Sequence, residues 1–280
     1  MPGQQIDVPS FTLNTGAKLP SVGLGCWMGY PGGGDDCENM AKTAIKLGYR
    51  HIDTAAGYGN EEHVGKAIRE SDVPRSEIFL VTKLNNKDHG RVAEAFQESL
   101  DRLGCEYVDL YLMHWPQAQN PDGKILQPDQ SPTYVETWQA MEKLLDTGKV
   151  KAIGVSNFSI KTLEVLLPQA KVVPAVNQVQ LHPCLPSFDL LAYCAQKGIH
   201  VTAYSPLGRK DSPFFSDDTI KSISDKHGIT IAQVLLSWGV QRGTSVIPKS
   251  VQEERLRSNF TTARSADDWT LAPDFIQQES

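Results

Sequence analysis

Short hydrophobic runs in this chain alternate with longer segments in which hydrophobic positions recur every three or four residues. In the segment 35–47, for example, Ala41, Ala44 and Ile45 fall on one face, which is the spacing of an amphipathic helix. Gly48 then interrupts the pattern. A short apolar strand, a polar turn and an amphipathic helix make a βα unit, and repeated βα units predict a parallel sheet.

The pattern predicts eight such units. The expected strands are 22–25, 51–53, 78–82, 107–113, 152–155, 175–179, 199–204 and 244–247. The expected helices are 35–47, 61–69, 90–103, 133–147, 159–167, 187–197, 217–241 with a break at Gly228, and 252–258. Before them, residues 10–13 and 17–19 flank a turn with a glycine, which predicts a β-hairpin that caps one end of the core.

Eight strands with at least as many helices predict a closed (β/α)8 (TIM) barrel of the α/β class. The length of 280 residues is close to the roughly 250 that are typical of such barrels. We therefore expect a single domain over 1–280, with the hairpin at about 10–19 and a short C-terminal tail at about 260–280. No GxGxxG motif opens a helix, so a doubly wound dinucleotide-binding sheet is disfavoured.

Composition and charge exclude several classes of protein. Hydrophobic residues make up 40% and charged residues 21% of the chain, which is typical of a globular protein rather than a disordered one. The net charge of -6 argues against nucleic acid as a partner, because phosphate binding needs clustered positive surface. The residues 1–7 are polar, and no apolar run approaches the roughly 18 residues of a membrane span. We expect a cytoplasmic protein without a membrane partner.

The cysteines indicate no disulfide framework. Cys26, Cys37, Cys105, Cys184 and Cys194 are an odd number without CxxC spacing, so neither paired disulfides nor a zinc site is indicated. Reduced, mostly buried thiols are the expected state.

Polar groups come at or near the ends of three consecutive predicted strands, which in a barrel meet at one rim. Asp53 ends the second strand, Lys83 and His114 follow the next two, and Tyr58 lies in a glycine-bracketed turn five residues after Asp53. A tyrosine is a weak acid at neutral pH, and a neighbouring ammonium group favours its ionised form. Each residue alone also has an ordinary structural explanation, whereas the four together predict acid–base chemistry on a carbonyl group.

The sequences HIDTAAGYGNEE, VTKL and LMHWP around these residues, in this order, closely resemble the aldo-keto reductase family. The resemblance extends over about 23–259. It implies NADP(H)-dependent reduction of aldehydes or ketones to alcohols, and the reverse oxidation, without a metal. It also implies the roles: Tyr58 as general acid/base, Lys83 and Asp53 as groups that tune it, and His114 as the group that orients the substrate. A small carbonyl or alcohol partner and a monomer are the family's tendency.

The same resemblance assigns a cofactor site. Ser156, Asn157 and Gln178 match positions that hydrogen-bond the nicotinamide carboxamide, and Tyr204 matches the ring that stacks on nicotinamide. The other matching positions are Ser205, Leu207 and Gly208 beside the pyrophosphate, Lys249, Ser250 and Arg255 around the 2′-phosphate, and Asn259 beside the adenine. Two cations and a hydroxyl at a helix N-terminus favour NADP(H) over NAD(H); the alternative is an ordinary capped surface helix.

Two departures from the family pattern concern the cofactor. Many members carry Glu where this chain has Ser258, and the loop from Gly208 to about Ser216 is shorter than the strap that covers the cofactor in larger members. The first argues against very tight adenine binding, and the second predicts easier cofactor exchange than in members with the long strap. The tail after 259, where members shape the substrate mouth, is short and polar, so the sequence leaves the substrate open among sugars, uronates, glycerol-type compounds, aromatic aldehydes and keto esters.

Aromatic residues near the expected rim predict an apolar substrate pocket. Trp27 and Trp115 are the candidate walls, because apolar carbonyl compounds need desolvated contact area, with core packing as the alternative for each. Tyr30, Trp138 and Trp238 are expected to pack in the structure. The run from Gly32 to Gly34 is expected to be a flexible turn, or else to touch a ligand.

Two rival functions remain. A metal-dependent barrel hydrolase would also use strand-end histidine and aspartate residues, but His51, Asp53 and His63 do not have a spacing that converges on one ion. The second rival is a catalytically weak, cofactor-binding regulatory protein on the same fold. The presence of all four catalytic groups disfavours it.

Overall fold

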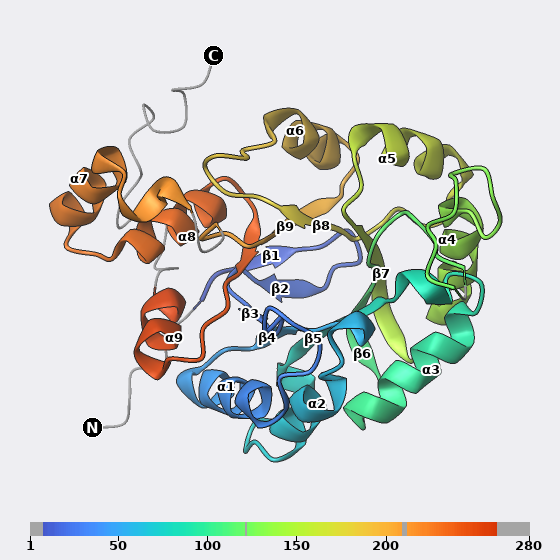
Figure 1. Cartoon of the computed structure of the whole chain (residues 1–280), viewed down its shortest axis with the longest axis horizontal. Coiled ribbons are helices and arrows are strands. Elements are labelled where there is room, and N and C mark those ends of the chain that lie inside the picture. Colours follow the sequence, from blue (N-terminus) through green and yellow to red (C-terminus); the bar gives the residue numbers. More distant parts are fainter. Residues whose placement is uncertain (1–7, 121, 209–211, 262–280) are drawn as a thin grey trace.

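The computed structural model describes residues 8–120, 122–208 and 212–261. Helices surround a central ring of strands (Figure 1). The strands are β1 (Ser10–Thr12), β2 (Lys18–Pro20), β3 (Leu24–Gly25), β4 (His51–Asp53), β5 (Phe79–Leu84), β6 (Val108–Met113), β7 (Val150–Ser156), β8 (Val176–Gln180), β9 (His200–Tyr204) and β10 (Ser245–Ile247).

The helices follow the strands along the chain. The α-helices are α1 (Gly34–Leu47), α2 (Glu61–Arg69), α3 (Val92–Leu103), α4 (Tyr134–Glu142), α5 (Ile160–Leu166), α6 (Phe188–Gln196), α7 (Asp218–His227), α8 (Ile231–Gln241) and α9 (Glu253–Phe260). Short 3-10 helices are η1 (Ala56–Tyr58), η2 (Arg75–Glu77), η3 (Asn86–Asp88), η4 (Lys143–Thr147), η5 (Leu167–Gln169) and η6 (Pro213–Phe215).

The eight strands β3 to β10 form one sheet in chain order, and all its pairs are parallel. The sheet closes on itself, because Val22 forms a parallel bridge with Val246, and the Gly25 N–H donates to the Pro248 carbonyl oxygen at 3.1 Å. A Cβ atom at Gly25 would lie 2.7 Å from the Ile247 carbonyl oxygen, so glycine permits this approach of the first strand to the last. The expected (β/α)8 barrel is confirmed.

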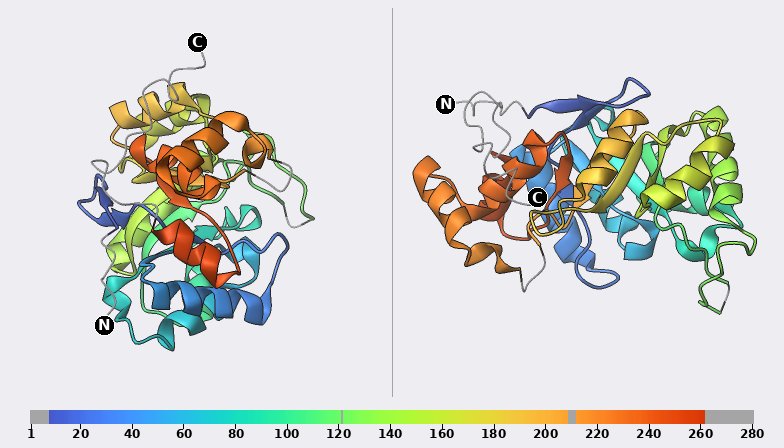
Figure 2. Two further views of the ribbon diagram at one scale, coloured as in Figure 1. Left: turned by 90° about the vertical axis from the view of Figure 1, so that its left-hand side faces the viewer. Right: turned by 90° about the horizontal axis from the view of Figure 1, so that it is seen from above.

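The hairpin β1–β2 covers the amino-terminal end of the barrel, as expected from its sequence. Leu13 and Leu19 belong to one buried cluster with side chains from the barrel strands, among them Phe79, Val81 and Leu112. Figure 2 shows the hairpin lying across one edge of the molecule. This end of the barrel is therefore filled with apolar side chains, and it leaves the opposite end for polar chemistry.

The helices pack their apolar faces on the outside of the sheet in a second, larger core. Helix α4 begins with a capping box, in which the Thr133 hydroxyl accepts from the Glu136 N–H and the Glu136 carboxylate accepts from the Thr133 N–H. Such caps satisfy backbone donors that the first turn leaves free. Gly104 ends α3 in the left-handed region, a conformation that glycine adopts without strain.

Four expectations need correction. The helix expected over 133–147 ends at Glu142 and continues as the 3-10 helix η4, with the Thr147 hydroxyl donating to the Leu144 carbonyl oxygen. The strand expected over 78–82 extends to Leu84. The first barrel strand, expected over 22–25, is reduced to two residues plus the bridge at Val22. Tyr30 is 54% exposed instead of packed.

Other expectations hold. Trp138 and Trp238 are buried, and α7 and α8 are separated at Gly228. All five cysteines are free thiols, of which Cys26, Cys37 and Cys194 are buried. Within the described part of the chain, no helix has the length and apolar character needed to cross a bilayer.

Candidate active site

The alternation of side chains along parallel strands carries functional groups into the barrel. On β5, Phe79 and Val81 contribute to the inner cluster, and Lys83 lies two residues further along on the same side of the strand. On β6, Leu110 and Leu112 take the same inner positions, and His114 follows two residues later. An apolar layer in the barrel is therefore followed, at the carboxyl ends of the strands, by a layer of titratable groups.

Lys83 is the centre of this polar layer, and its side chain is fully buried. Its Nζ donates to Asp53 Oδ1 at 2.5 Å, to the Thr54 carbonyl oxygen at 2.9 Å and to the Tyr58 hydroxyl at 3.4 Å. The second oxygen of Asp53 accepts from Gln178 Nε2 at 2.7 Å. The amine is thus within hydrogen-bonding distance of both the carboxylate and the phenol that the sequence predicted it to meet.

Burial and the charge of Lys83 shift the pKa of Tyr58 in opposite directions. Burial raises the pKa of the phenol, because loss of water disfavours the charged phenolate, and this outweighs the opposing effect of the Lys83 ammonium. The pKa of Lys83 is lowered by burial, but Asp53 and Tyr58 reverse this and raise it overall. Lys83 therefore stays charged. The expected downward influence of Lys83 on the pKa of Tyr58 is present, but the upward influence of burial is larger.

His114 lies beside Tyr58, with ring centroids 5.5 Å apart in an edge-on arrangement. Burial and then the Lys83 charge lower the pKa of His114 to about 3. The imidazole is therefore neutral at physiological pH, and a neutral imidazole carries one N–H donor. The His114 carbonyl oxygen accepts from Asn157 Nδ2 at 2.9 Å, which ties the histidine to the next part of the site.

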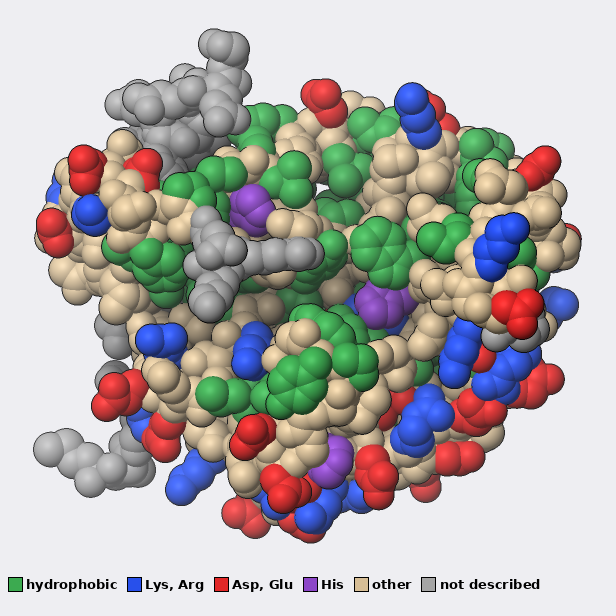
Figure 3. Space-filling view, in the orientation of Figure 1, with side chains coloured by type: hydrophobic (Ala, Val, Ile, Leu, Met, Phe, Trp, Pro, Cys, Tyr) green, Lys and Arg blue, Asp and Glu red, His purple; other side chains and the backbone are tan. Residues whose placement is uncertain are grey.

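A cavity of about 1130 Å³ opens at the carboxyl ends of the strands, and Figure 3 shows this face hollowed near its centre, with hydrophobic side chains around the depression. It is larger than the roughly 300–1,000 Å³ of typical small-molecule sites. The expected site residues that line it are Trp27, Asp53, Tyr58, His114, Trp115, Ser156, Asn157, Gln178, Tyr204, Ser205, Leu207, Gly208 and Lys249. Lys83 lies behind Asp53 and Tyr58.

The residues expected to hold a carboxamide form a connected group on β7, β8 and β9. The Ser156 hydroxyl donates to the Gln178 carbonyl oxygen at 2.8 Å, Asn157 Nδ2 lies 3.1 Å from Ser156 Oγ, and the Tyr204 hydroxyl donates to Asn157 Oδ1 at 2.9 Å. Asn157 and Ser205 have positive φ values of 63° and 49°. Strained backbone of this kind is often found at ligand sites.

Of the residues expected around the 2′-phosphate, Lys249 belongs to the lining of the cavity, and Ser250 and Arg255 do not. Lys249 lines the cavity and is exposed, whereas Ser250 is buried and accepts from the Gln252 N–H at 3.2 Å. Arg255 is exposed on α9, and Asn259 is buried on the same helix. Of the positions 208–216, residues 209–211 lie outside the described part, as does the tail beyond 261.

Both candidate wall residues are at the mouth of the cavity. Trp27 and Trp115 are each 41% exposed and line it, and the Trp27 ring lies 5.1 Å from the Tyr58 ring. Neither is a core-packing residue. The run Gly32–Gly34 does not line the cavity; instead, the Gly32 N–H donates to the Tyr58 carbonyl oxygen at 2.7 Å.

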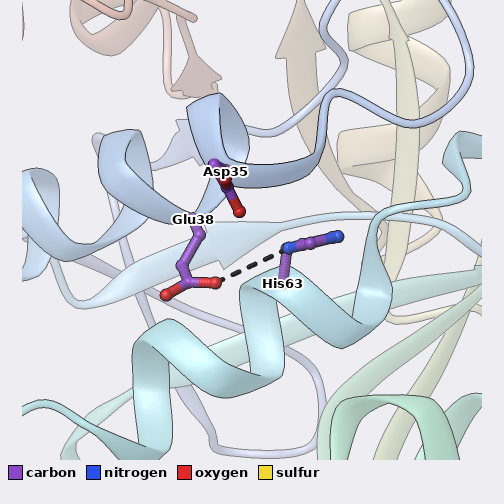
Figure 4. A group of neighbouring side chains, drawn as sticks. All are labelled: Asp35, Glu38 and His63. Carbon is purple, nitrogen blue, oxygen red and sulfur yellow. Dashed lines mark ion pairs between the residues drawn. The ribbon is translucent and has the colours of Figure 1, made fainter.

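The residues of the rival metal site do not converge. His51 is buried at the opposite end of β4, with Nδ1 3.2 Å from the Pro20 carbonyl oxygen. His63 is on α2 and faces Glu38 and Asp35 of α1 instead (Figure 4). This is the one group with metal-binding spacing among the described residues. The Glu38 carboxylate there already pairs with the ammonium groups of Lys42 and Lys66, at 2.6 and 3.0 Å.

Three further residues in the site had no role in the sequence prediction. Thr54 supplies the carbonyl oxygen that binds Lys83, Met28 lines the cavity, and Asn60 joins two loops of the site. Asn60 and Thr54 were both visible in the motif HIDTAAGYGNEE. Their partners lie up to 34 positions away in the chain, so spacing alone gave no signal for their contacts.

Comparison with known proteins decides the family. A model of the aldo/keto reductase family matches residues 22–269. The chain belongs to this family. It is 45% identical over 265 residues to glycerol 2-dehydrogenase (NADP(+)) of Saccharomyces cerevisiae, a match that covers 89% of this chain and 84% of the yeast protein. It is 44% identical over 267 residues to D-galacturonate reductase of Hypocrea jecorina, covering 90% of this chain and 84% of the relative.

Solved structures agree with this assignment to the aldo/keto reductases. The crystal structure of an aldo-keto reductase of Bombyx mori in complex with NADP matches with a TM-score of 0.88 and 35% identity, covering 97% of this chain and 91% of that one. The relatives' names include different substrates, so family membership leaves the substrate of this aldo/keto reductase to be argued from its cavity.

Proposed function

We propose that this protein reduces aldehydes and ketones to alcohols with NADPH, and catalyses the reverse oxidation with NADP⁺. The observation that carries the proposal is the position of the Tyr58 hydroxyl. It is at the cavity, 3.4 Å from an ammonium group that is itself held by Asp53, and the neutral ring of His114 is next to it. A proton donor and a hydrogen-bond donor are thus placed beside one another, as reduction of a carbonyl requires.

The cavity fits an NADP(H) molecule in size and in the chemistry of its lining. Its volume exceeds that of typical small-molecule sites. Among its lining residues, Tyr204 offers an aromatic ring, Ser156, Asn157 and Gln178 offer hydroxyl and amide groups, and Lys249 offers a cation. NADPH, when bound, supplies the hydride, whereas the proton must come from the protein.

The protein's own residues handle that proton and the carbonyl oxygen. Tyr58 gives its hydroxyl proton to the oxygen of the reduced carbonyl, and the nearby Lys83 ammonium stabilises the phenolate that remains. Asp53 keeps Lys83 charged and in place through the 2.5 Å contact. His114, neutral because of burial, donates a hydrogen bond to the carbonyl oxygen and orients it toward Tyr58.

The substrate class that fits this site is an uncharged carbonyl compound. Among the described residues that line the cavity, Asp53 and Lys249 are the charged ones, and Asp53 is already paired. Trp27, Met28 and Trp115 present apolar surface at the mouth. A carboxylate on the substrate would lose its hydration against this apolar surface, and no described residue of the mouth offers it a cationic partner.

Five further properties belong to this proposal. The protein acts as a single-domain monomer in the cytoplasm, and it needs no metal ion. Cofactor exchange is easy compared with family members that have a longer strap, because the loop from Gly208 to about Ser216 is shorter than that strap, and Ser258, in place of the Glu of many relatives, argues against very tight adenine binding. Here the Ser258 carbonyl oxygen accepts from Gln233 of α8 at 3.1 Å. A cofactor release rate far below the rate of hydride transfer in transient kinetics would contradict the last point.

NADPH consumption at 340 nm with benzaldehyde tests the proposal. Tyr58→Phe should lower kcat by about 10²–10⁴-fold, which is the usual contribution of a general acid, and should change the Kd for NADPH by less than about threefold, because the phenol acts on the substrate oxygen. Tyr30→Phe, which removes a hydroxyl from an exposed tyrosine, is the matched control. Full activity of Tyr58→Phe would contradict the proposed mechanism. Binding of NADPH by the wild type without turnover of any aldehyde would favour a regulatory protein.

A further inference from the structure

Asn60 precedes the first turn of α2 but does not form the capping hydrogen bond that asparagine usually forms at this position. It is the N-cap residue of α2, where a side chain of this type normally accepts a hydrogen bond from the first turn of its own helix. In this structure the Asn60 side chain makes no cap hydrogen bond. It is 1% exposed and is turned into the protein instead.

The Asn60 side chain makes two hydrogen bonds there. Its Oδ1 accepts from the Thr54 hydroxyl at 2.7 Å, and its Nδ2 donates to the Cys26 carbonyl oxygen at 2.8 Å. Thr54 and Asn60 are the first and last residues of the turn that carries Tyr58. The first bond therefore closes the turn on itself, and the second ties it to the loop that follows β3.

The turn that carries Tyr58 and the loop that follows β3 both belong to the proposed active site. The Thr54 carbonyl oxygen binds Lys83 Nζ at 2.9 Å, and Cys26 directly precedes Trp27, whose ring lies 5.1 Å from the Tyr58 ring. The Gly32 N–H, at the other end of the loop after β3, donates to the Tyr58 carbonyl oxygen at 2.7 Å. The turn 54–60 (the Tyr58 turn) and the loop 26–33 (the Trp27 loop) are thus joined by hydrogen bonds at two places.

The chemistry of this junction suits asparagine in particular. The Cys26 carbonyl oxygen is only an acceptor, so the amide nitrogen must face it, and the amide oxygen then faces the Thr54 hydroxyl. Aspartate would place a carboxylate oxygen against the Cys26 carbonyl oxygen. Alanine would leave the buried Thr54 hydroxyl and Cys26 carbonyl oxygen without this partner.

We infer that Asn60 is a positioning residue for the proposed carbonyl reduction: through Thr54 and Cys26 it holds the Tyr58 turn against Lys83 and the Trp27 loop. The inference rests on the proposed function for its effect on turnover, and on the geometry alone for its effect on the Tyr58–Lys83 contact. It acts through Tyr58 and touches neither substrate nor cofactor.

Steady-state kinetics of Asn60→Ala and Thr54→Val test the inference. Because a displacement of about 1 Å at a reacting group costs on the order of 10²-fold in rate, Asn60→Ala should lower kcat by about 10–100-fold. The KM for NADPH should stay within about threefold, since cofactor contacts are elsewhere. Thr54→Val, which removes only the hydroxyl that binds Asn60, should show a smaller loss of the same kind.

Two controls separate positioning from a general loss of stability. Thr82→Val removes another fully buried threonine hydroxyl, which binds Glu61 beside Asn60 at 2.5 Å; it should lower the melting temperature but leave kcat within about twofold. In a Tyr58→Phe background, adding Asn60→Ala should change the residual rate by less than about twofold, because residues that act through one group are not additive.

Crystal structures of the wild-type protein and Asn60→Ala provide a readout that does not depend on turnover. The separation of Tyr58 Oη and Lys83 Nζ, 3.4 Å with Asn60 in place, should increase in the variant. An active wild type with an unchanged kcat in Asn60→Ala, or an unchanged separation, overturns the inference while the proposed function stands. An inactive wild type contradicts the proposed function, and the two separations then still decide the positioning.

Discussion

Lys83 has no exposed side-chain surface. A buried ammonium group destabilises the folded protein unless it is fully paired. Asp53 supplies the countercharge, and the Thr54 carbonyl oxygen and Tyr58 hydroxyl take its other N–H groups. A hydrophobic residue of similar size would often give equal or greater stability at such a site. The charge is therefore better explained by its effect on the pKa of Tyr58 than by stability.

The low pKa of His114 predicts how stability depends on pH. Burial, and then Lys83, lower it from 6.5 to about 3, so the unfolded chain takes up this proton at a higher pH than the folded protein does. The contribution of neutral His114 to stability is therefore fully present above pH 6.5 and is lost as the pH falls from 6.5 toward 3.

His114→Gln should remove this part of the pH dependence. Between pH 7 and pH 5, the wild type should lose up to about 2 kcal/mol more unfolding free energy than His114→Gln, because each pKa unit corresponds to about 1.4 kcal/mol. Urea unfolding at the two pH values measures the difference. An equal loss in both proteins would mean that His114 takes up its proton in the folded state at an ordinary pKa.

At the scale of single residues, the sequence predicted which groups matter better than it predicted what they touch. Asp53 and Lys83 meet as expected because inward positions on adjacent strands follow from the two-residue period, and Tyr58 joins them from the turn that follows Asp53. That Gln178 binds Asp53, 125 positions earlier, could not be predicted, because side chains from opposite walls of a barrel meet only when the ring is closed. The contact between Asn60 and Cys26 was not predicted either, because it joins the loops that follow the neighbouring strands β3 and β4, and residue spacing gives no signal for a contact between two loops.

Among the structural elements, the start of α9 has the clearest functional consequence. Lys249 and Ser250 precede this helix and Arg255 is in it, so an anion there would meet two cations and the positive end of the helix dipole. Because Lys249 also lines the cavity, this element is the proposed site for the phosphate that distinguishes NADP(H) from NAD(H).

Lys249→Met should weaken this preference selectively. The KM for NADPH should rise by about 10–100-fold, as expected for loss of one charge-assisted phosphate contact worth about 1.5–3 kcal/mol, whereas the KM for NADH should change by less than about threefold. Arg257→Gln is the control on the same helix, because Arg257 is exposed and pairs with Glu253. If the KM values for both cofactors rose equally, Lys249 would not be a 2′-phosphate ligand.

The elements themselves could largely be predicted, and the errors have local causes. The break at Gly228 follows from its left-handed conformation at the end of α7. The 3-10 end of the segment 133–147 was not predicted, because its apolar spacing continues through Leu144 and Leu145. There the Thr147 hydroxyl binds the Leu144 carbonyl oxygen and Gly148 follows in the left-handed region, which tightens the last turn.

In the whole molecule, the residues that stabilise the fold and the residues proposed for catalysis lie at opposite ends of the barrel. The hairpin β1–β2 and the apolar cluster around Leu19 fill the amino-terminal end, whereas the titratable groups and the cavity are at the carboxyl-terminal end. This division is general for such barrels, and it was predictable from the order of apolar and polar residues along each strand. Closure of the ring at Gly25 depends on contacts between the first and last strands, which no local pattern encodes.

Leu19→Ala tests this division, because Leu19 is fully buried in an apolar cluster that includes none of the proposed active-site residues. The unfolding free energy should fall by about 2–5 kcal/mol, the usual cost of removing a buried leucine side chain, while kcat at 25 °C stays within about twofold. Lys18→Ala, an exposed neighbour on the same strand, should change the unfolding free energy by less than about 0.5 kcal/mol. Urea unfolding and initial rates on the same preparations give both quantities. A kcat that fell in proportion to stability would mean that the hairpin end transmits its packing through the barrel to Lys83 and Tyr58, so the two ends would not be independent.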